Sequence, residues 1–236
     1  MAENKDKIIV ALDTPSMDAA ERIVKDLEGI ISFYKVGCEF FAAHGWRAVE
    51  FIKKQKARVF LDLKLHDIPN TVSKTMAVLC EHEVDMVTVH TLGGFEMMQK
   101  TTKIANERAA TGKHKPLILG VTILTSHSDK QLKEDLGIER SVEDQVSHLA
   151  ELANRAGFDG VISSPHETKR LRSERSNDFL IVTPGVRPMG SDLMDQKRTF
   201  TPKDALAAGA NFLVIGRPIT GESNPKEAAI KIIKSI

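Results

Sequence analysis

The stretch LDLKLHD, residues 61–67, places charged side chains in an otherwise apolar, strand-like run. Asp62 and Lys64 alternate with leucines, and Asp67 follows shortly after them. Side chains two residues apart in a strand point to the same face, so the Asp62 carboxylate and the Lys64 ammonium should lie on one face of the strand. Burying one such charge alone is very costly, whereas an alternating array of acids and bases can satisfy itself. The run therefore predicts either a chemical site or a structural ion-pair network.

The lysine of this run is suited to donating a proton. An ammonium flanked by carboxylates has its charged form favoured, so we expect Lys64 to be protonated at neutral pH. A Schiff-base nucleophile would instead need a neutral amine. A general acid beside a carboxylate suggests a reaction through a carbanion, because the carboxylate disfavours an anionic substrate group and the lysine can protonate the carbanion that forms.

These side chains need a scaffold, and short apolar runs alternate along the chain with longer amphipathic ones. The pattern predicts eight strands, at residues 7–13, 33–38, 58–65, 86–91, 117–124, 160–165, 179–184 and 212–218. Helical patterns fill the gaps, and those at 16–30, 201–209 and 223–236 open with a residue suited to capping. Eight strand–helix units in 236 residues predict an α/β fold. We expect a (β/α)8 TIM barrel, eight parallel strands with surrounding helices, as a single catalytic domain over 1–236.

An open, doubly wound sheet is the alternative fold, but no GxGxxG motif follows the first strand. In a barrel, chemistry is built at the carboxyl ends of the strands. Asp13 ends the first strand and Lys35 lies on the second, so three carboxylates and two ammoniums gather on three neighbouring strands. This is more charge than closing a barrel requires, which favours a functional array over a structural network.

The last two strands indicate a phosphate site. Gly185 and Arg187 follow the seventh strand, and Gly216 and Arg217 follow the eighth. Barrels often bind phosphate at these two loops through backbone N–H groups and an arginine. Two ordinary turns are the alternative reading. The long loops at 125–140 and 185–200 are expected to act as functional lids.

Composition excludes several other classes of protein. The net charge is +1, with one Trp and one Tyr, so neither a basic field nor a stacking platform for nucleic acid is expected. The run KRLRSER, residues 169–175, is typical of a solvated helix face. Cys38 and Cys80 have no metal-ligand spacing and are expected to pack in the core, as suits a reducing cytoplasm. The sequence predicts no signal peptide and no membrane span, and His66 and His90 are only weak site candidates.

The run DLKLHDIPNTV, residues 62–72, resembles the signature of the orotidine 5′-phosphate decarboxylase family, whose core is D-x-K-x-x-D. Further segments resemble the bacterial branch and occur in the family's order: VALD (10–13), YKVG (34–37), VTILTS (121–126), AGFDGVISSPHE (156–167), TPGVRP (183–188), DQKR (195–198) and VIGRPI (214–219). The core alone is less specific, because related sugar-phosphate enzymes share it. Thr91 stands where the family usually has alanine.

The resemblance implies a cytoplasmic homodimer that converts orotidine 5′-phosphate to UMP and CO₂ in de novo pyrimidine biosynthesis. It implies no metal and no organic cofactor. Lys64 would protonate C6 as the carboxylate leaves, with Asp62 against that carboxylate. Asp67 would come from the partner subunit and complete an alternating array with Lys35.

The resemblance also implies how the rest of the nucleotide is bound. Asp13 and Lys35 would contact ribose hydroxyls, and Thr71 would reach the ribose from the partner subunit. The remaining substrate contacts would come from the pyrimidine-facing turn, the lid and the phosphate loops, at Thr125, Ser126, Pro184, Gln196, Arg187, Gly216 and Arg217.

Two alternative functions stay open from the sequence. One is a related sugar-phosphate decarboxylase or aldolase, which would use Mg²⁺ and which the IPNTV and DQKR segments disfavour. The other is a catalytically silent barrel that binds UMP, which would have no need of Lys64.

Overall fold

The structure, a computed structural model, describes residues 2–187 and 200–236. Its eight strands form a closed barrel in the order of the sequence, and the strand pairings are parallel. The (β/α)8 prediction is therefore confirmed. The strands are β1 (Ile8–Ala11), β2 (Phe33–Gly37), β3 (Arg58–Leu65), β4 (Met86–His90), β5 (Leu117–Val121), β6 (Gly160–Ile162), β7 (Leu180–Pro184) and β8 (Phe212–Ile215).

Helices separate the strands, and the predicted caps are confirmed. The side chains of Ser16, Thr201 and Asn224 each accept a hydrogen bond from a backbone N–H of the first helical turn, which satisfies one of its unpaired donors. The helices are α1 (Ala2–Lys5), α2 (Met17–Asp26), α3 (Cys38–His44), α4 (Trp46–Lys54), α5 (Pro69–Glu81), the 3₁₀ turn η1 (Thr91–Gly93), α6 (Phe95–Ala110), α7 (Asp129–Leu136), α8 (Val142–Arg155), α9 (Pro165–Glu174), α10 (Pro202–Ala207), α11 (Arg217–Thr220) and α12 (Pro225–Ser235).

One of the two cysteine predictions is wrong. Cys80 is buried on α5, as expected, but Cys38 is exposed. Strand β2 ends at Gly37, which serves as the N-cap of α3, so Cys38 begins a helix and does not continue the strand. The apolar run that suggested a longer strand spans both elements, and hydrophobicity alone does not mark the boundary.

The chain divides into two compact units. The first comprises Met1–Leu63 and Thr183–Ile236. Within it, β1 pairs with both β2 and β8, and β2 pairs with β3. Every residue of β1 and β2 is buried, as expected for parallel strands covered on both faces.

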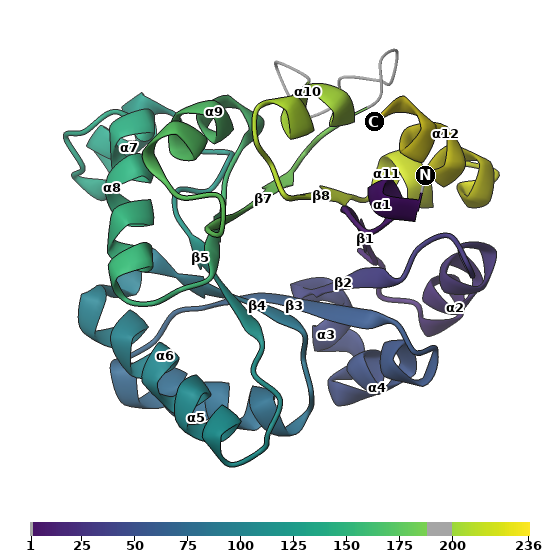
Figure 1. Ribbon diagram of the computed structural model, residues 1–236, viewed down its shortest axis with the longest axis horizontal. Helices are drawn as coiled ribbons and strands as arrows, with labels where there is room; N and C mark the ends of the chain where they lie inside the picture. The colour runs from purple at the N-terminus through teal and green to yellow at the C-terminus, as the bar shows by residue number, and fades with distance from the viewer. Residues whose placement is uncertain (1, 188–199) are drawn as a thin grey trace. The chain divides into compact units, whose positions relative to one another are not determined.

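The second unit comprises Lys64–Val182. Within it, β4 pairs with β5, β5 with β6, and β6 with β7. Helices α5 and α6 pack side by side against one another, and α8 packs against α9 (Figure 1).

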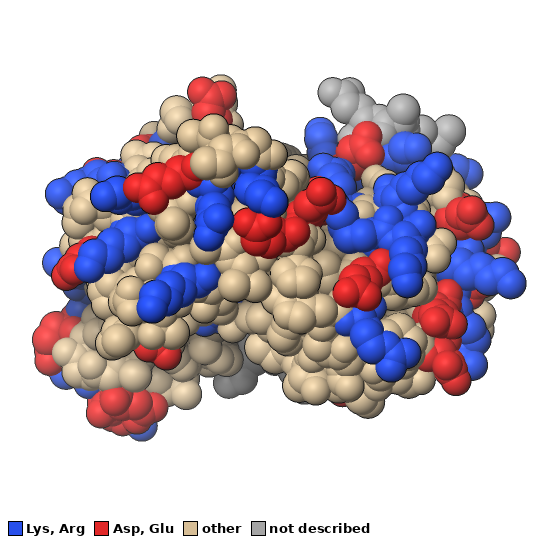
Figure 2. Space-filling view, turned by 90° about the horizontal axis from the view of Figure 1, so that it is seen from below, with Lys and Arg blue, Asp and Glu red and all other residues tan. Residues whose placement is uncertain are grey.

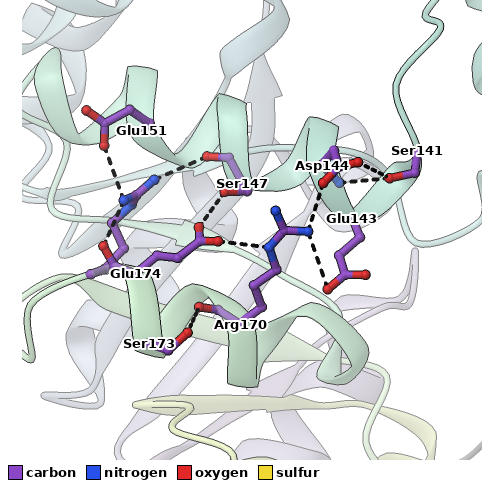
Figure 3. A network of polar contacts seen from close by, with 9 residues as sticks. Ser141, Glu143, Asp144, Ser147, Glu151, Arg170, Ser173 and Glu174 are labelled. Atoms are coloured by element: carbon purple, nitrogen blue, oxygen red, sulfur yellow. Dashed lines mark hydrogen bonds and ion pairs between the residues drawn. The ribbon is translucent and has the colours of Figure 1, made fainter.

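An ion-pair network joins α8 to α9 on the second unit (Figure 3). The Arg170 guanidinium lies 2.9 Å from Asp144, 3.4 Å from Glu143 and 2.8 Å from Glu174. Hydrogen bonds to Glu174 and Asp144 hold the pKa of Arg170 above its usual range. The basic run at 169–175 is thus matched by acids, which agrees with a solvated helix face. On the face drawn in Figure 2, basic and acidic side chains are likewise interspersed.

Among the described residues, no helix is both long enough and apolar enough to cross a lipid bilayer.

Gly160 fixes how closely β6 and β7 approach. It pairs with Leu180, and a Cβ at position 160 would collide with the carbonyl oxygen of that residue. We expect Gly160→Ala to lower the free energy of unfolding by about 2–3 kcal/mol, measured by urea denaturation, because the two strands must separate. Gly112→Ala is the control, since its site is open and only its φ of 81° is unfavourable; it should cost about 1 kcal/mol. Equal losses in the two variants would contradict this account of β6 and β7.

Candidate active site

Lys35 is a buried cation held between two carboxylates. Its Nζ lies 2.8 Å from Oδ1 of Asp13 and 3.8 Å from Oδ2 of Asp62. The Lys35 and Asp62 side chains are 11% and 13% exposed, whereas Asp13 is 56% exposed. Opposite charges this close compensate part of the cost of removing the ammonium from water. Three of the five predicted charged residues thus form a continuous Asp–Lys–Asp chain in the first unit.

Strand register brings these three residues together. Lys35 pairs with Ala11 of β1, and Asp13 lies two residues beyond Ala11. On the other side, Asp62 of β3 pairs with Gly37 of β2. All three charges therefore lie towards the carboxyl ends of neighbouring strands, where barrel enzymes build their chemistry.

Gly37 is a site residue that was missed from the sequence. It is two residues after Lys35 in β2, so the two residues share a face of the strand. A Cβ at position 37 would lie 2.8 Å from Lys35 Nζ and 3.2 Å from Asp13 Oδ1. The glycine leaves the space that the ion pair occupies. The available signal was a glycine inside a strand, which often marks a close approach of other groups.

The loop after β8, which the sequence predicts to bind phosphate, lies beside this charged chain within the same unit. A Cβ at Gly216 would lie 3.7 Å from Asp13 Oδ2 and 3.6 Å from the Cβ of Ala11. Arg217 is exposed at the start of α11. Arg187 is buried, and its backbone N–H donates to the carbonyl of Phe200 at 3.0 Å.

Two further predicted binding residues are Pro184 and Gln196. Pro184 is the last residue of β7 and is half-buried. Gln196, with the rest of the DQKR segment, lies outside the described residues.

Lys64 begins the second unit and departs from regular strand geometry. Its φ is 51°, in the left-handed region that non-glycine residues seldom adopt. Its backbone N–H donates to Oγ1 of Thr88 at 2.9 Å. The regular strand backbone expected for residues 61–65 is therefore interrupted at Lys64.

The other predicted residues of the second unit are exposed. Asp67 follows β3, and its Oδ1 accepts the N–H of Ile68 at 2.6 Å. Thr71 is in the first turn of α5, and Thr125 and Ser126 form a turn after β5. The structure brings none of these four into a mutual hydrogen bond among the described contacts.

His66 and His90 stack on one another in the second unit, with ring centroids 5.0 Å apart. Burial lowers the pKa of His90 to about 4, with smaller contributions from the charges of His66, Lys64 and His127. The imidazole is therefore neutral at pH 7. Its Nδ1 can accept the N–H of Leu92 at 3.4 Å, which caps η1.

Thr91, which the sequence resemblance suggests is a departure from the family pattern, is buried. Its hydroxyl donates to the carbonyl of Val121 at 2.7 Å. Its methyl group occupies space next to Gly120, where a Cβ would lie only 2.7 Å away. Thr91 therefore packs next to Gly120 and links η1 to β5 by a hydrogen bond.

A cavity of about 540 Å³ lies elsewhere in the first unit. Its lining includes Lys25, Ser32, Tyr34 and Ala57, and contains none of the predicted site residues. Ser32 and Ala57 precede β2 and β3, so the cavity is at the amino ends of these strands, away from the charged chain. In the parts of the chain that the structure describes, no three or more His, Cys, Asp or Glu side chains form a group that could hold a metal.

The geometry around Gly37 generates a testable prediction. Gly37→Ala should displace the Lys35 ammonium, because the new methyl group would occupy its position, and the Lys35–Asp13 distance should increase beyond 2.8 Å. A long, flexible side chain can move, so the free energy of unfolding should fall by only about 1 kcal/mol. A crystal structure and urea denaturation measure the two effects. An unmoved ammonium in the variant would show that Gly37 does not shape the pair.

Comparison with known proteins shows which family this chain resembles. The family model described as "Orotidine 5'-phosphate decarboxylase / HUMPS family" matches residues 6–232. Orotidine 5′-phosphate decarboxylase from Moorella thermoacetica is 48% identical over 98% of this chain and 92% of its own length, and that from Syntrophotalea carbinolica is 45% identical over 100% and 97%. The crystal structure of orotidine 5′-phosphate decarboxylase from Lactobacillus acidophilus superimposes with a TM-score of 0.85, at 38% identity over 97% of this chain and 98% of that one. The chain therefore belongs to the orotidine 5′-phosphate decarboxylase / HUMPS family.

Proposed function

We propose that this protein decarboxylates orotidine 5′-phosphate to UMP and CO₂, without a metal or an organic cofactor. The observation that carries the proposal is the Asp13–Lys35–Asp62 chain, which ends two residues before Lys64 on the same strand. The family membership and the names of the relatives supply the substrate. We propose that residues 1–236 act as one catalytic domain, since β3 and β7 each continue from one compact unit into the other.

In this proposal the charged residues act on the substrate carboxylate and on C6. The Asp62 carboxylate faces the carboxylate of the substrate and disfavours it in the ground state. The bond between C6 and the carboxylate carbon breaks, its electron pair stays on C6, and CO₂ leaves. Lys64 gives a proton to C6 and regains one from solvent. Because only the transition state carries charge on C6, a fixed ammonium there lowers the barrier selectively.

The remaining parts of the nucleotide would be held by the loops around the array. Asp13 and Lys35 bind ribose hydroxyls, and the closeness of Gly216 to Asp13 supports a phosphate next to the ribose site. Glycine allows backbone N–H groups to approach a phosphate, and arginine adds a bidentate donor. The full set of proposed binding residues is Asp13, Lys35, Thr71, Thr125, Ser126, Pro184, Arg187, Gln196, Gly216 and Arg217.

We also propose a homodimer in which Asp67 and Thr71 serve the partner's site. Both residues are exposed in the second unit. Close to them, Ile68 is 65% exposed, and Leu92 and Leu124 are also exposed large apolar residues. These three follow β3, β4 and β5, which are successive strands of the barrel, so they are suited to contact a second copy. The proposal that the protein acts in the cytoplasm rests on its two free thiols.

The first prediction from this function concerns Lys64. Metal-stripped wild-type protein should convert orotidine 5′-phosphate to UMP. The loss of substrate absorbance measures this conversion. Lys64→Ala should lose about 10²–10⁴-fold in kcat, because it removes the proton donor, while still binding UMP in calorimetry. Lys103→Ala, on the exposed face of α6, is the matched control and should retain wild-type kcat.

Three outcomes would point away from this function. Turnover of a sugar phosphate that requires added Mg²⁺ would indicate the related branch of enzymes. UMP binding without turnover by the wild-type protein would indicate a silent barrel. A Lys64→Ala variant with near wild-type kcat would reject the proposed proton donor.

The second prediction concerns the shared site. Lys64→Ala and Asp67→Ala homodimers should each be nearly inactive. After the two are mixed and allowed to exchange subunits, half of the dimers should be mixed and carry one intact site each, restoring about a quarter of wild-type activity. Size-exclusion chromatography would establish that exchange occurs between dimers. If the activity after exchange equals only the summed residual activities of the two homodimers, Asp67 does not contribute to the partner's site.

A further inference from the structure

Lys64 has a backbone conformation that its position in the fold does not explain. Among the described residues, Lys56, Lys64 and Glu83 are the non-glycine residues with positive φ. Lys56 follows α4 and Glu83 follows α5, in the place where a left-handed residue commonly closes a helix. Lys64 instead lies inside β3. A left-handed residue within a strand is unfavourable and persists only where its surroundings determine it.

The surroundings of Lys64 include one buried acceptor for its amide. The Lys64 N–H donates to Oγ1 of Thr88 at 2.9 Å, so its partner is a side chain on β4. Thr88 is fully buried, as are Val87 and Val89 on either side of it. β4 is also paired with β5, with Thr88 level with Leu119. A β-branched side chain has few rotamers, so this hydroxyl is a fixed acceptor.

We propose that Thr88 is a positioning residue for Lys64: its buried hydroxyl holds the left-handed backbone at Lys64 and thereby directs the lysine side chain. The inference rests on the proposed role of Lys64 as proton donor. In an extended strand the side chain would leave the backbone in another direction, so loss of the bond would move the ammonium. A misplacement of about 1 Å at a reacting group can cost about 100-fold in rate.

The test removes the acceptor while keeping the shape of the side chain. Thr88→Val should lower kcat about 100-fold and leave KM for orotidine 5′-phosphate within about twofold, because it affects the chemical step more than binding. Its crystal structure should show a negative φ at Lys64. Thr88→Ser keeps the hydroxyl and should retain both a positive φ and kcat within about threefold of wild type.

Thr101→Val controls for the loss of a buried threonine hydroxyl as such. Thr101 is buried on α6 of the same unit, and its hydroxyl donates to the carbonyl of Met97 at 2.8 Å. This variant should lose stability without losing kcat. If Thr88→Val does not fold, Thr88→Ala removes the same acceptor with a smaller side chain. The kinetic and crystallographic measurements are then made on Thr88→Ala.

Retained kcat in the acceptor-less variant, or an unchanged φ near 51° at Lys64, would overturn the proposal. The two readouts also separate it from the proposed function. If wild-type protein does not decarboxylate orotidine 5′-phosphate, the function fails, and the φ of Lys64 in the variant still decides whether Thr88 holds the backbone.

Discussion

The buried ammonium of Lys35 is the constraint on which the first unit of the protein depends. A lysine that is nine-tenths removed from water is tolerable only with close counter-charges, and both Asp13 and Asp62 supply one. Asp13 follows β1 and Asp62 lies on β3, so the pair distances require β1, β2 and β3 to keep their register. The ion chain thus ties the packing of three strands to the chemistry proposed at their ends.

Much of this fold could be predicted from the sequence, because local patterns of hydrophobic and capping residues indicate its strands and helices. Strand β3 was predicted at its observed bounds, and the caps at Ser16, Thr201 and Asn224 follow from residue type and spacing. Strand ends were predicted less well: the apolar run through Cys38 extends past β2 into a helix. Hydrophobic periodicity reports which segments are buried but does not report where the backbone turns.

The charged residues of the site could also be named in advance, since charge in an apolar run is conspicuous. Their geometry could not. Gly37 and Thr88 matter through contacts with Lys35 and Lys64 that arise only when strands are in register. A threonine in a strand carries no charge or motif that would single it out, and a glycine there signals a close approach without showing which groups approach. The left-handed backbone of Lys64 is also invisible in a pattern that reads as regular alternation.

The contact between Thr91 and Gly120 has an evolutionary consequence. The Thr91 methyl group fills the space that a side chain at position 120 would need, while Ala153 and Phe158 approach from other sides. The effect of a substitution at one position therefore depends on the residue present at the other. A lineage that carries threonine at 91 must lose that methyl group before a larger residue at 120 becomes tolerable. The order of mutations, and not only their identity, then determines which sequences this barrel can reach.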